Sequence, residues 1–180
     1  MKKSISIFFL IGISTCCLAQ AYKPIDQNSE VKFAIRNFGL NVTGSFKGLN
    51  GSIIFNPENL AASGFNVSVQ ANTVNTGNNS RDKHLKKEDY FDVEKYPVLN
   101  FTSAKISNGI KPGVYLVEGL LTIKNKKKNI NFPFTTTSVT DGYQLQAQFK
   151  INRRDFNVGG NSLVLSDELT VSLKVYAKKE

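Results

Sequence analysis

Residues 143–151 read Tyr-Gln-Leu-Gln-Ala-Gln-Phe-Lys-Ile, so every second side chain is apolar and those between are polar. Successive side chains of a β-strand point to opposite faces, so this alternation predicts a strand with one face in a core and one in water. The same period of two recurs on both sides of this stretch, in residues 31–35, 42–46, 53–55, 65–71, 99–103, 115–123, 130–134 and 169–175. The chain is therefore predicted to be all-β.

Turn signals separate several of these runs. Asn50-Gly51, Asn108-Gly109 and Asp141-Gly142 are dipeptides that supply the positive φ of tight hairpin turns, so the flanking strands are expected to be antiparallel neighbours. Regular short strands with little helix are typical of a sandwich or an up-and-down barrel. The barrel is preferred because closure removes exposed strand edges.

One stretch, residues 72–96, interrupts the strand pattern. Asn79 is predicted to cap a short helix, with Asp82 three residues later, and residues 83–89 favour helix. No internal repeat or linker divides the 180-residue chain, so a single domain over residues 22–180 is expected.

Residues 1–21 have the pattern of an export signal. Lys2 and Lys3 precede an apolar segment at residues 5–13, and Ala19-Gln20-Ala21 provides small residues for cleavage. Lipidation at Cys16 is the less favoured alternative. Cleavage would remove both cysteines, Cys16 and its neighbour, so no disulfide framework is expected. The predicted location is the periplasm or the medium.

The basic composition, 23 Lys and Arg against 14 Asp and Glu, invites a nucleic-acid hypothesis. The densest basic run, Lys124–Asn129, has neither arginine nor aromatic side chains that stack on bases, so nucleic acid is not the expected partner. This run is predicted to be a solvated turn, with transient attraction to anionic membrane surfaces as the alternative.

Little in the sequence points to catalysis. His84 is the only histidine, the exported chain would have no thiol, and nucleophile-elbow and phosphate-loop motifs are absent. We therefore expect neither an enzyme nor a bound metal or other cofactor. The polar cluster at residues 81–85 is interpreted either as a charged rim at a barrel mouth or as a local structural network, and the structural alternative is favoured.

The chain has 13 Phe and 6 Tyr residues, and most Phe residues after the leader fall on the apolar sides of the predicted strands. They fit either a filled core or a cavity for one elongated lipid, because an eight-stranded barrel can enclose both. Glycines within or beside strands, at positions 44, 48, 51 and 119, leave room inside and favour the cavity.

Several motifs in order along the chain resemble the YceI-like family of exported lipid-binding proteins. They are the segments at residues 31–35, 37–55 and 75–78, Arg-Asp-Lys-His-Leu at 81–85, Tyr-Phe-Asp at 90–92, Tyr-Pro at 96–97, Phe-Thr-Ser at 101–103 and Arg-Arg-Asp-Phe-Asn-Val-Gly at 153–159. The resemblance implies an eight-stranded, lipocalin-like antiparallel barrel with one short helix in a long loop. It also implies non-catalytic binding of a polyisoprenoid, quinone or fatty amphiphile. Family members often carry His where this chain has Asn37, so a head group touching that position would be selected differently.

The leading hypothesis is therefore an exported lipid carrier or reservoir. Its predicted ligand-binding residues comprise an apolar lining and a polar rim: Phe33, Ile35, Phe46, Phe55, Val67, Val69, Phe101, Val117, Leu121, Phe134, Phe149 and Leu173, with Arg81, Asp82, His84, Arg154 and Asp155. The alternatives are a structural or stress-response interaction protein with a filled core, and a hydrolase or isomerase if His84 faces an enclosed site. The oligomeric state stays open, with a homodimer as one alternative.

Overall fold

The computed structural model describes residues 20–180, and the predicted leader, but for its last two residues, lies outside the described residues. Strands dominate this part of the chain. In chain order the elements are β1 Ala21–Pro24, η1 Asp26–Asn28, β2 Glu30–Asn37, β3 Leu40–Ile54, η2 Leu60–Ala62, β4 Gly64–Asn75, α1 Asn79–Leu85, β5 Val98–Asn108, β6 Val114–Ile123, β7 Lys126–Val139, β8 Gly142–Asn152, η3 Arg153–Phe156 and β9 Leu165–Lys179.

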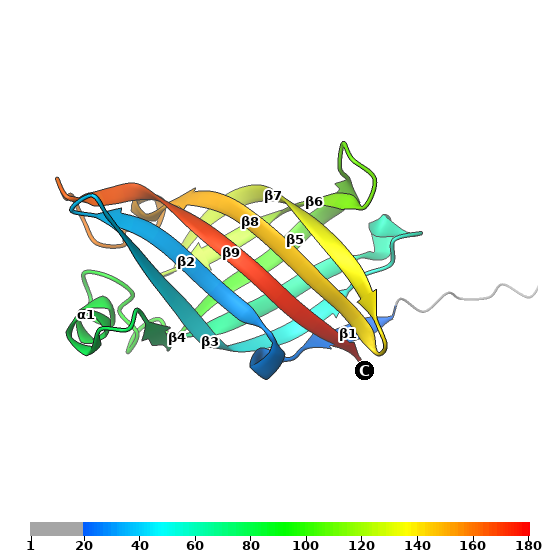
Figure 1. The fold of residues 1–180 in the computed structure, drawn as a ribbon, viewed down its shortest axis with the longest axis horizontal. Helices are drawn as coiled ribbons and strands as arrows, with labels where there is room; N and C mark the ends of the chain where they lie inside the picture. The colour runs from blue at the N-terminus through cyan, green and yellow to red at the C-terminus, as the bar shows by residue number, and fades with distance from the viewer. Residues whose placement is uncertain (1–19) are drawn as a thin grey trace, which may run out of the picture.

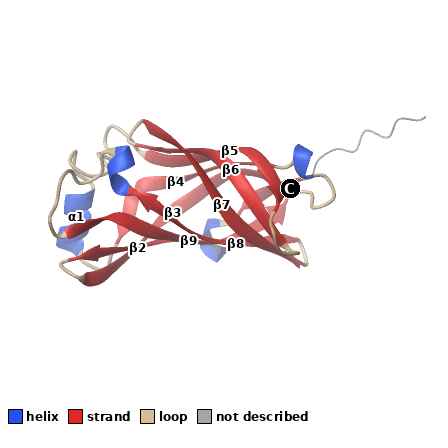
Figure 2. Ribbon diagram, turned by 90° about the horizontal axis from the view of Figure 1, so that it is seen from above, coloured by secondary structure: helices blue, strands red, loops and turns tan. Residues whose placement is uncertain are grey.

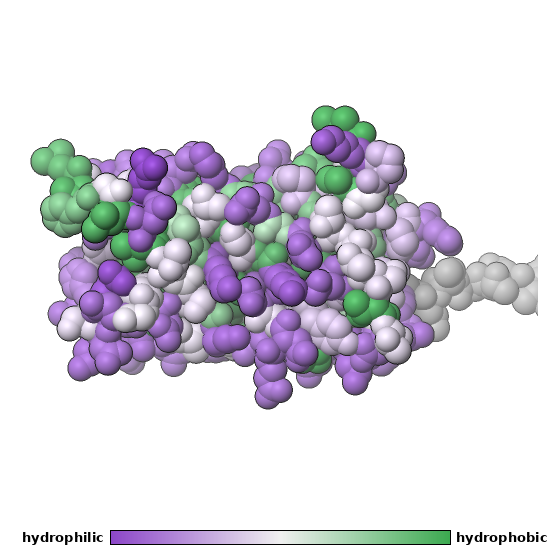
Figure 3. Space-filling model, in the orientation of Figure 1, coloured by the Kyte–Doolittle hydropathy of each residue, from purple (hydrophilic) through white to green (hydrophobic). Residues whose placement is uncertain are grey.

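Eight of the strands close into an antiparallel barrel (Figures 1 and 2). Their order is β3-β2-β9-β8-β7-β6-β5-β4, and pairing of β3 with β4 completes the ring. The predicted eight-stranded antiparallel barrel with one short α-helix is therefore confirmed. Polar residues cover much of the outer face in Figure 3, as the alternation requires.

The short strand β1 was not predicted. It lies between β3 and β9, in the part of the barrel that β2 does not reach. Tyr22 is opposite Ile53 of β3 on one side and Lys179 of β9 on the other. The helix η1 separates it from β2, and the buried Ser29 hydroxyl fixes this break by donating to the Ile25 carbonyl at 2.7 Å and accepting from the Tyr176 N–H at 3.0 Å. A four-residue strand is too short to show a period of two.

The predicted hairpin turn at Asn50-Gly51 was wrong. Both residues lie inside β3, which joins two runs that the sequence pattern separated. Gly51 has φ of 129° and pairs in regular register with Val67 of β4, and a Cβ there would lie 2.1 Å from the Asn66 carbonyl oxygen. The irregular register lies just before it, between Lys47 and Asn50, where Gly48 has φ of 73°. Gly51 therefore serves a close approach of two strands rather than a chain reversal, and the bulge belongs to the residues before Asn50.

The tight turns with positive φ occur elsewhere, at Phe38-Gly39 and Lys124-Asn125. The second of these confirms the turn predicted within the lysine-rich run. Strands β5 and β6 beside Asn108-Gly109 are antiparallel neighbours as predicted, but a loop to Val114 joins them. Strands β7 and β8 are also neighbours, and their turn has no positive φ.

The barrel interior has two unlike halves along its length. One end carries the connections β2–β3, β4–β5, β6–β7 and β8–β9, and the other end carries the remaining connections and the C-terminus. At the second end, side chains from most strands fill the interior, namely Tyr22, Ile53, Phe55, Ile106, Val117, Phe132, Phe134, Leu145 and Ala177. We call this end the packed half and the other the open half.

Candidate functional site: an apolar cavity in the open half

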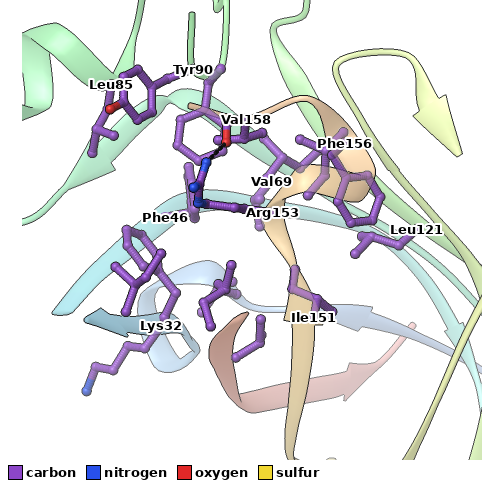
Figure 4. A pocket seen from close by; sticks show the side chains of 18 of the residues that line it. Lys32, Phe46, Val69, Leu85, Tyr90, Leu121, Ile151, Arg153, Phe156 and Val158 are labelled. Carbon is purple, nitrogen blue, oxygen red and sulfur yellow. Dashed lines mark hydrogen bonds between the residues drawn. The ribbon is translucent and has the colours of Figure 1, made fainter. Parts of the chain in front are cut away.

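A cavity of about 470 Å³ occupies the open half of the barrel (Figure 4). Strands that run toward the open end, such as β8, line the cavity with their last residues. Strands that run away from it, such as β9, line the cavity with their first residues. Most lining side chains are aliphatic or aromatic. Its volume lies in the usual range for a small-molecule site of roughly 300–1,000 Å³. The geometry therefore fits one apolar ligand.

An aromatic layer separates the cavity from the packed half. Phe132 and Phe149 stack with ring centres 4.0 Å apart, and Phe101 contacts Phe132 at 5.5 Å. Phe132 belongs to the core of the packed half and also lines the cavity. The layer is thus the floor of the cavity.

Two aromatic rings lie against the cavity wall over glycines. Phe33 pairs across the strands with Gly44, and a Cβ on Gly44 would lie 2.3 Å from the Phe33 ring. Phe101 covers Gly119 in the same way, at 2.6 Å. The space left by these glycines is therefore occupied by rings that lie flat on the wall, and the centre of the barrel stays free of them.

The loop between β4 and β5, which includes α1, covers one side of the cavity. Leu85, Tyr90 and Phe91 from this loop line the cavity, and Phe91 packs edge-to-face on Phe46 with ring centres 5.3 Å apart. The helix cap is Asn78, whose side chain accepts from the Arg81 N–H at 3.0 Å, so the predicted cap at Asn79 was wrong by one residue.

Arg81 and Asp82 organise this loop through a shared partner, Thr76. Arg81 Nε donates to the Thr76 hydroxyl oxygen at 2.7 Å, and that hydroxyl donates to Asp82 at 2.6 Å. Asp82 also accepts from the Thr76 N–H at 2.9 Å. Both residues therefore hold the loop in place, as the structural alternative predicted. Arg81 also borders the cavity.

Arg153 is the polar residue that the sequence analysis missed. Its side chain is 3% exposed and borders the cavity, and in Figure 4 it bonds to Val158. The guanidinium donates to the carbonyls of residues 158, 159, 160, 165 and 166 and to the Asp167 carboxylate. Arg153 therefore fixes the loop between η3 and β9.

The sequence contained a signal for this placement. In β8 the odd-numbered residues 143–151 face inward, and continuing that alternation places residue 153 inward and residue 154 outward. Arg154 and Asp155, the predicted rim residues, are instead exposed and do not line the cavity. Asp155 lies 3.4 Å from Lys128, and Arg154 lies 3.9 Å from Asp167.

The structure brings most of the predicted lining together. The predicted residues that line the cavity are Phe33, Ile35, Phe46, Val67, Val69, Arg81, His84, Phe101, Leu121, Phe149 and Leu173. Phe55, Val117 and Phe134 do not line it, because they point into the packed half. Asp82 is directed to Thr76 instead. Asn37 lies at the cavity, as do the unpredicted Phe91, Leu99, Phe156 and Val158.

His84 lies at the rim beside a second, polar pocket. It is exposed, and its ring contacts Tyr90 with centres 4.9 Å apart. Glu88, Asp89 and Lys124 line this polar pocket, and Lys124 Nζ donates to the Glu88 carbonyl at 2.6 Å. The hydrolase or isomerase hypothesis required His84 to face an enclosed site, whereas His84 is an exposed residue at the rim, shared by the cavity and the polar pocket.

Three further observations apply to residues 20–180. No group of three or more His, Cys, Asp or Glu side chains is placed to hold a metal ion. In the same residues, each buried side-chain nitrogen or oxygen has a hydrogen-bond partner. Nor does any helix of this described region have the length and apolar character to cross a membrane. The cavity wall therefore offers a ligand an apolar surface with no unpaired polar group in its buried part.

Solved structures with the same fold come from bacteria. BcnA from Burkholderia cenocepacia matches with a TM-score of 0.80 at 22% identity, over 84% of this chain and 98% of the other. A polyisoprenoid binding domain from Saccharophagus degradans matches with a TM-score of 0.72 at 18% identity, over 89% and 99%. At these identities the likeness shows the fold alone.

Sequence comparison identifies the family. The UPF0312 protein plu2095 from Photorhabdus laumondii is 32% identical over 93% of this chain and 91% of its own length, and Protein YceI from Salmonella arizonae is 29% identical over 97% of each. The family model described as the YceI-like domain matches residues 22–177. With the barrel and its apolar cavity, these matches establish that the chain belongs to the YceI-like family.

Proposed function

We propose that this protein binds one polyisoprenoid, quinone or similar long-chain amphiphile in the open half of its barrel and carries or stores it outside the cytoplasm. The observation that carries the proposal is the cavity itself: about 470 Å³ of space, walled by aliphatic and aromatic side chains. In the described residues the buried side-chain polar atoms already have hydrogen-bond partners. An apolar chain can therefore enter the cavity without giving up hydrogen bonds to water, whereas a polar ligand would lose them.

Two other findings support the proposal. A protein of the same fold, from Saccharophagus degradans, is described as a polyisoprenoid binding domain. The leader pattern at residues 1–21 supports export to the periplasm or medium. The competing idea of a structural protein with a filled core does not describe this interior, because the open half keeps a cavity beside its buried side chains. The function proposed is binding without catalysis.

The first test identifies the natural ligand. Protein purified from its own host should show, by native mass spectrometry, a one-to-one complex whose extra mass is released by organic solvent. A long-chain amphiphile should appear in the extract. N-terminal sequencing of the same sample should give Gln20 or Tyr22, whereas an intact Met1 or a lipid-modified Cys16 would contradict soluble export.

The second test measures selectivity in solution with geraniol, farnesol and geranylgeraniol. Each added isoprene unit should tighten binding by about tenfold or more until the cavity is full, because apolar burial drives the affinity. Replacing the alcohol by a methyl ether should change the affinity little, since the buried part of the cavity wall has no unpaired polar side-chain atom that would bind the hydroxyl. Absence of binding to all three alcohols, with no lipid recovered from the native protein, would disprove the carrier function.

A further inference from the structure

Large apolar side chains are exposed at one place on the open end. Phe38 and Leu40 of the β2–β3 connection are 74% and 72% exposed, and Leu163, in the loop before β9, is 106% exposed. Val164, in the same loop as Leu163, is also exposed. The Phe38 N–H donates to the Val164 carbonyl at 2.9 Å, so a hydrogen bond joins the two connections. We call Phe38, Leu40, Leu163 and Val164 the apolar lip. Figure 3 shows hydrophobic surface protruding at this end.

The apolar lip is continuous with the cavity. Phe38 and Val164 both line the cavity as well as contributing to the exposed surface. Leu40 and Leu163 belong only to the exposed part, since neither lines the cavity. An apolar chain leaving the cavity at this point therefore meets further apolar side chains before it meets water.

Basic side chains lie around the same end, interspersed with exposed acids such as Glu88, Asp89 and Glu168. Arg36 is exposed on β2 beside the lip, Lys83 and Lys87 are exposed at α1 and just after it, and Lys126 and Lys127 follow the β6–β7 turn. Exposed Lys and Arg are attracted to anionic lipid head groups, and exposed Leu and Phe enter the region just below them. Apolar tips flanked by positive charge fit the surface of a bilayer.

We propose that the apolar lip inserts into the surface of an anionic lipid bilayer and joins the cavity to it, so that a chain passes between the two without crossing water. This inference rests on the proposed carrier function. It also assigns a role to Leu40 and Leu163 that ligand binding alone does not require. A second copy of the chain is a less suitable partner, because four side chains are far fewer than the roughly 20–30 residues per side of a stable interface.

The test is flotation with vesicles of phosphatidylcholine and phosphatidylglycerol. The variant is the double substitution Leu40→Ser with Leu163→Ser. Its matched control is Ile110→Ser, because Ile110 is 103% exposed but lies on the β5–β6 connection at the opposite end. Wild type and Ile110→Ser should float equally. The double variant should bind vesicles at least about tenfold more weakly, since it loses two inserting side chains.

A second readout separates docking from the carrier function. Geranylgeraniol binding in solution should be unchanged in the double variant, while its rate of uptake from vesicles should fall about as much as flotation. Equal flotation of the double variant and wild type would overturn the docking proposal, as would a wild-type dimer that the double substitution dissociates and that does not float. Wild type that floats through the lip but binds no alcohol would disprove the carrier function alone.

Discussion

The packed and open halves of the barrel are built from the same eight strands and the same alternation, yet only one is filled. In the packed half, the Phe55 ring meets Tyr115 at 5.0 Å, Tyr143 at 5.3 Å and Phe134 at 5.9 Å, all edge-to-face. Rings from different strands therefore meet across the interior. β1 contributes Tyr22, which contacts Tyr143 at 5.3 Å and closes this cluster on one side.

In the open half the rings contact neighbours on the wall or the covering loop. Phe33 lies 5.7 Å from Phe46 and over Gly44, and Phe46 contacts Phe91 of the loop. Polar bonds hold the ends of this half: Arg81 and Asp82 around Thr76, and Arg153 within its loop. Aromatic packing across the interior therefore stabilises the packed half, while hydrogen bonds within the end loops support the open half.

The largest expected effect comes from removing a ring of the packed half. Phe55→Ala should lower the free energy of unfolding by about 3–5 kcal/mol, because Phe55 is almost completely buried and its loss leaves a cavity. Phe33→Ala is the matched control in the open half. It should cost less than about 2 kcal/mol, since Phe33 is only partly buried and already faces open space. Urea unfolding measures both, and equal losses would contradict the division into two halves.

The next effect tests the frame of the open half. Arg153→Leu should lower the free energy of unfolding by about 2–4 kcal/mol, because it leaves the buried Val158 carbonyl and several partly buried carbonyls without their donor. Hydrogen exchange of residues 157–167 should rise at the same time. The adjacent Arg154→Leu is the control, and its change should stay within about 0.5 kcal/mol because Arg154 is exposed. Similar losses in both variants would show that Arg153 does not hold the loop.

Replacing a small side chain by Trp should affect stability in the packed half and ligand binding in the open half. Val117→Trp places a large ring in the packed half and should cost about 1–3 kcal/mol or more by overpacking. Val69→Trp adds the same bulk at the cavity wall, so the protein should stay folded. Binding of geranylgeraniol should then weaken by about tenfold or more, because the new ring takes the space of the chain. A Val69→Trp protein that is destabilised as much as Val117→Trp would indicate a filled open half.

The smallest expected effect concerns pH at the packed end. The Tyr176 hydroxyl donates to the Asp141 carboxylate, and this bond, with Lys178 nearby, lowers the pKa of Asp141 below its ordinary 3.8. A lowered carboxyl pKa contributes stability above the ordinary pKa, and this contribution is lost as the pH falls through the lowered value.

Tyr176→Phe should therefore be slightly less stable than wild type at neutral pH, and the difference should shrink as the pH falls below 3.8. Urea midpoints measured between pH 6 and pH 2.5 give the comparison. A difference that stays constant over this range would mean that the hydroxyl does not act through the Asp141 charge.

The sequence alone indicated the all-β class, the inward face of each long strand and a short helix near residue 79. The helix ends at Leu85, so its predicted continuation to residue 89 was wrong. These three features depend on neighbours a few positions apart, since alternation and capping are local geometry. Even the inward placement of Arg153 follows from the alternation that begins at Tyr143. The same local argument could not tell that Asn50-Gly51 lies inside a continuous strand, because a glycine with positive φ serves a turn or a close approach of two strands equally.

The tertiary structure decided which inward side chains meet. Phe55 and Phe33 follow the same rule of alternation, but Phe55 meets three rings from distant strands and Phe33 lies over Gly44 beside a cavity. Whether interior space is filled depends on residues that are tens of positions apart and on how the closed barrel brings them together. Periodicity fixes the direction of a side chain, and only the packing of the whole barrel fixes what lies opposite it.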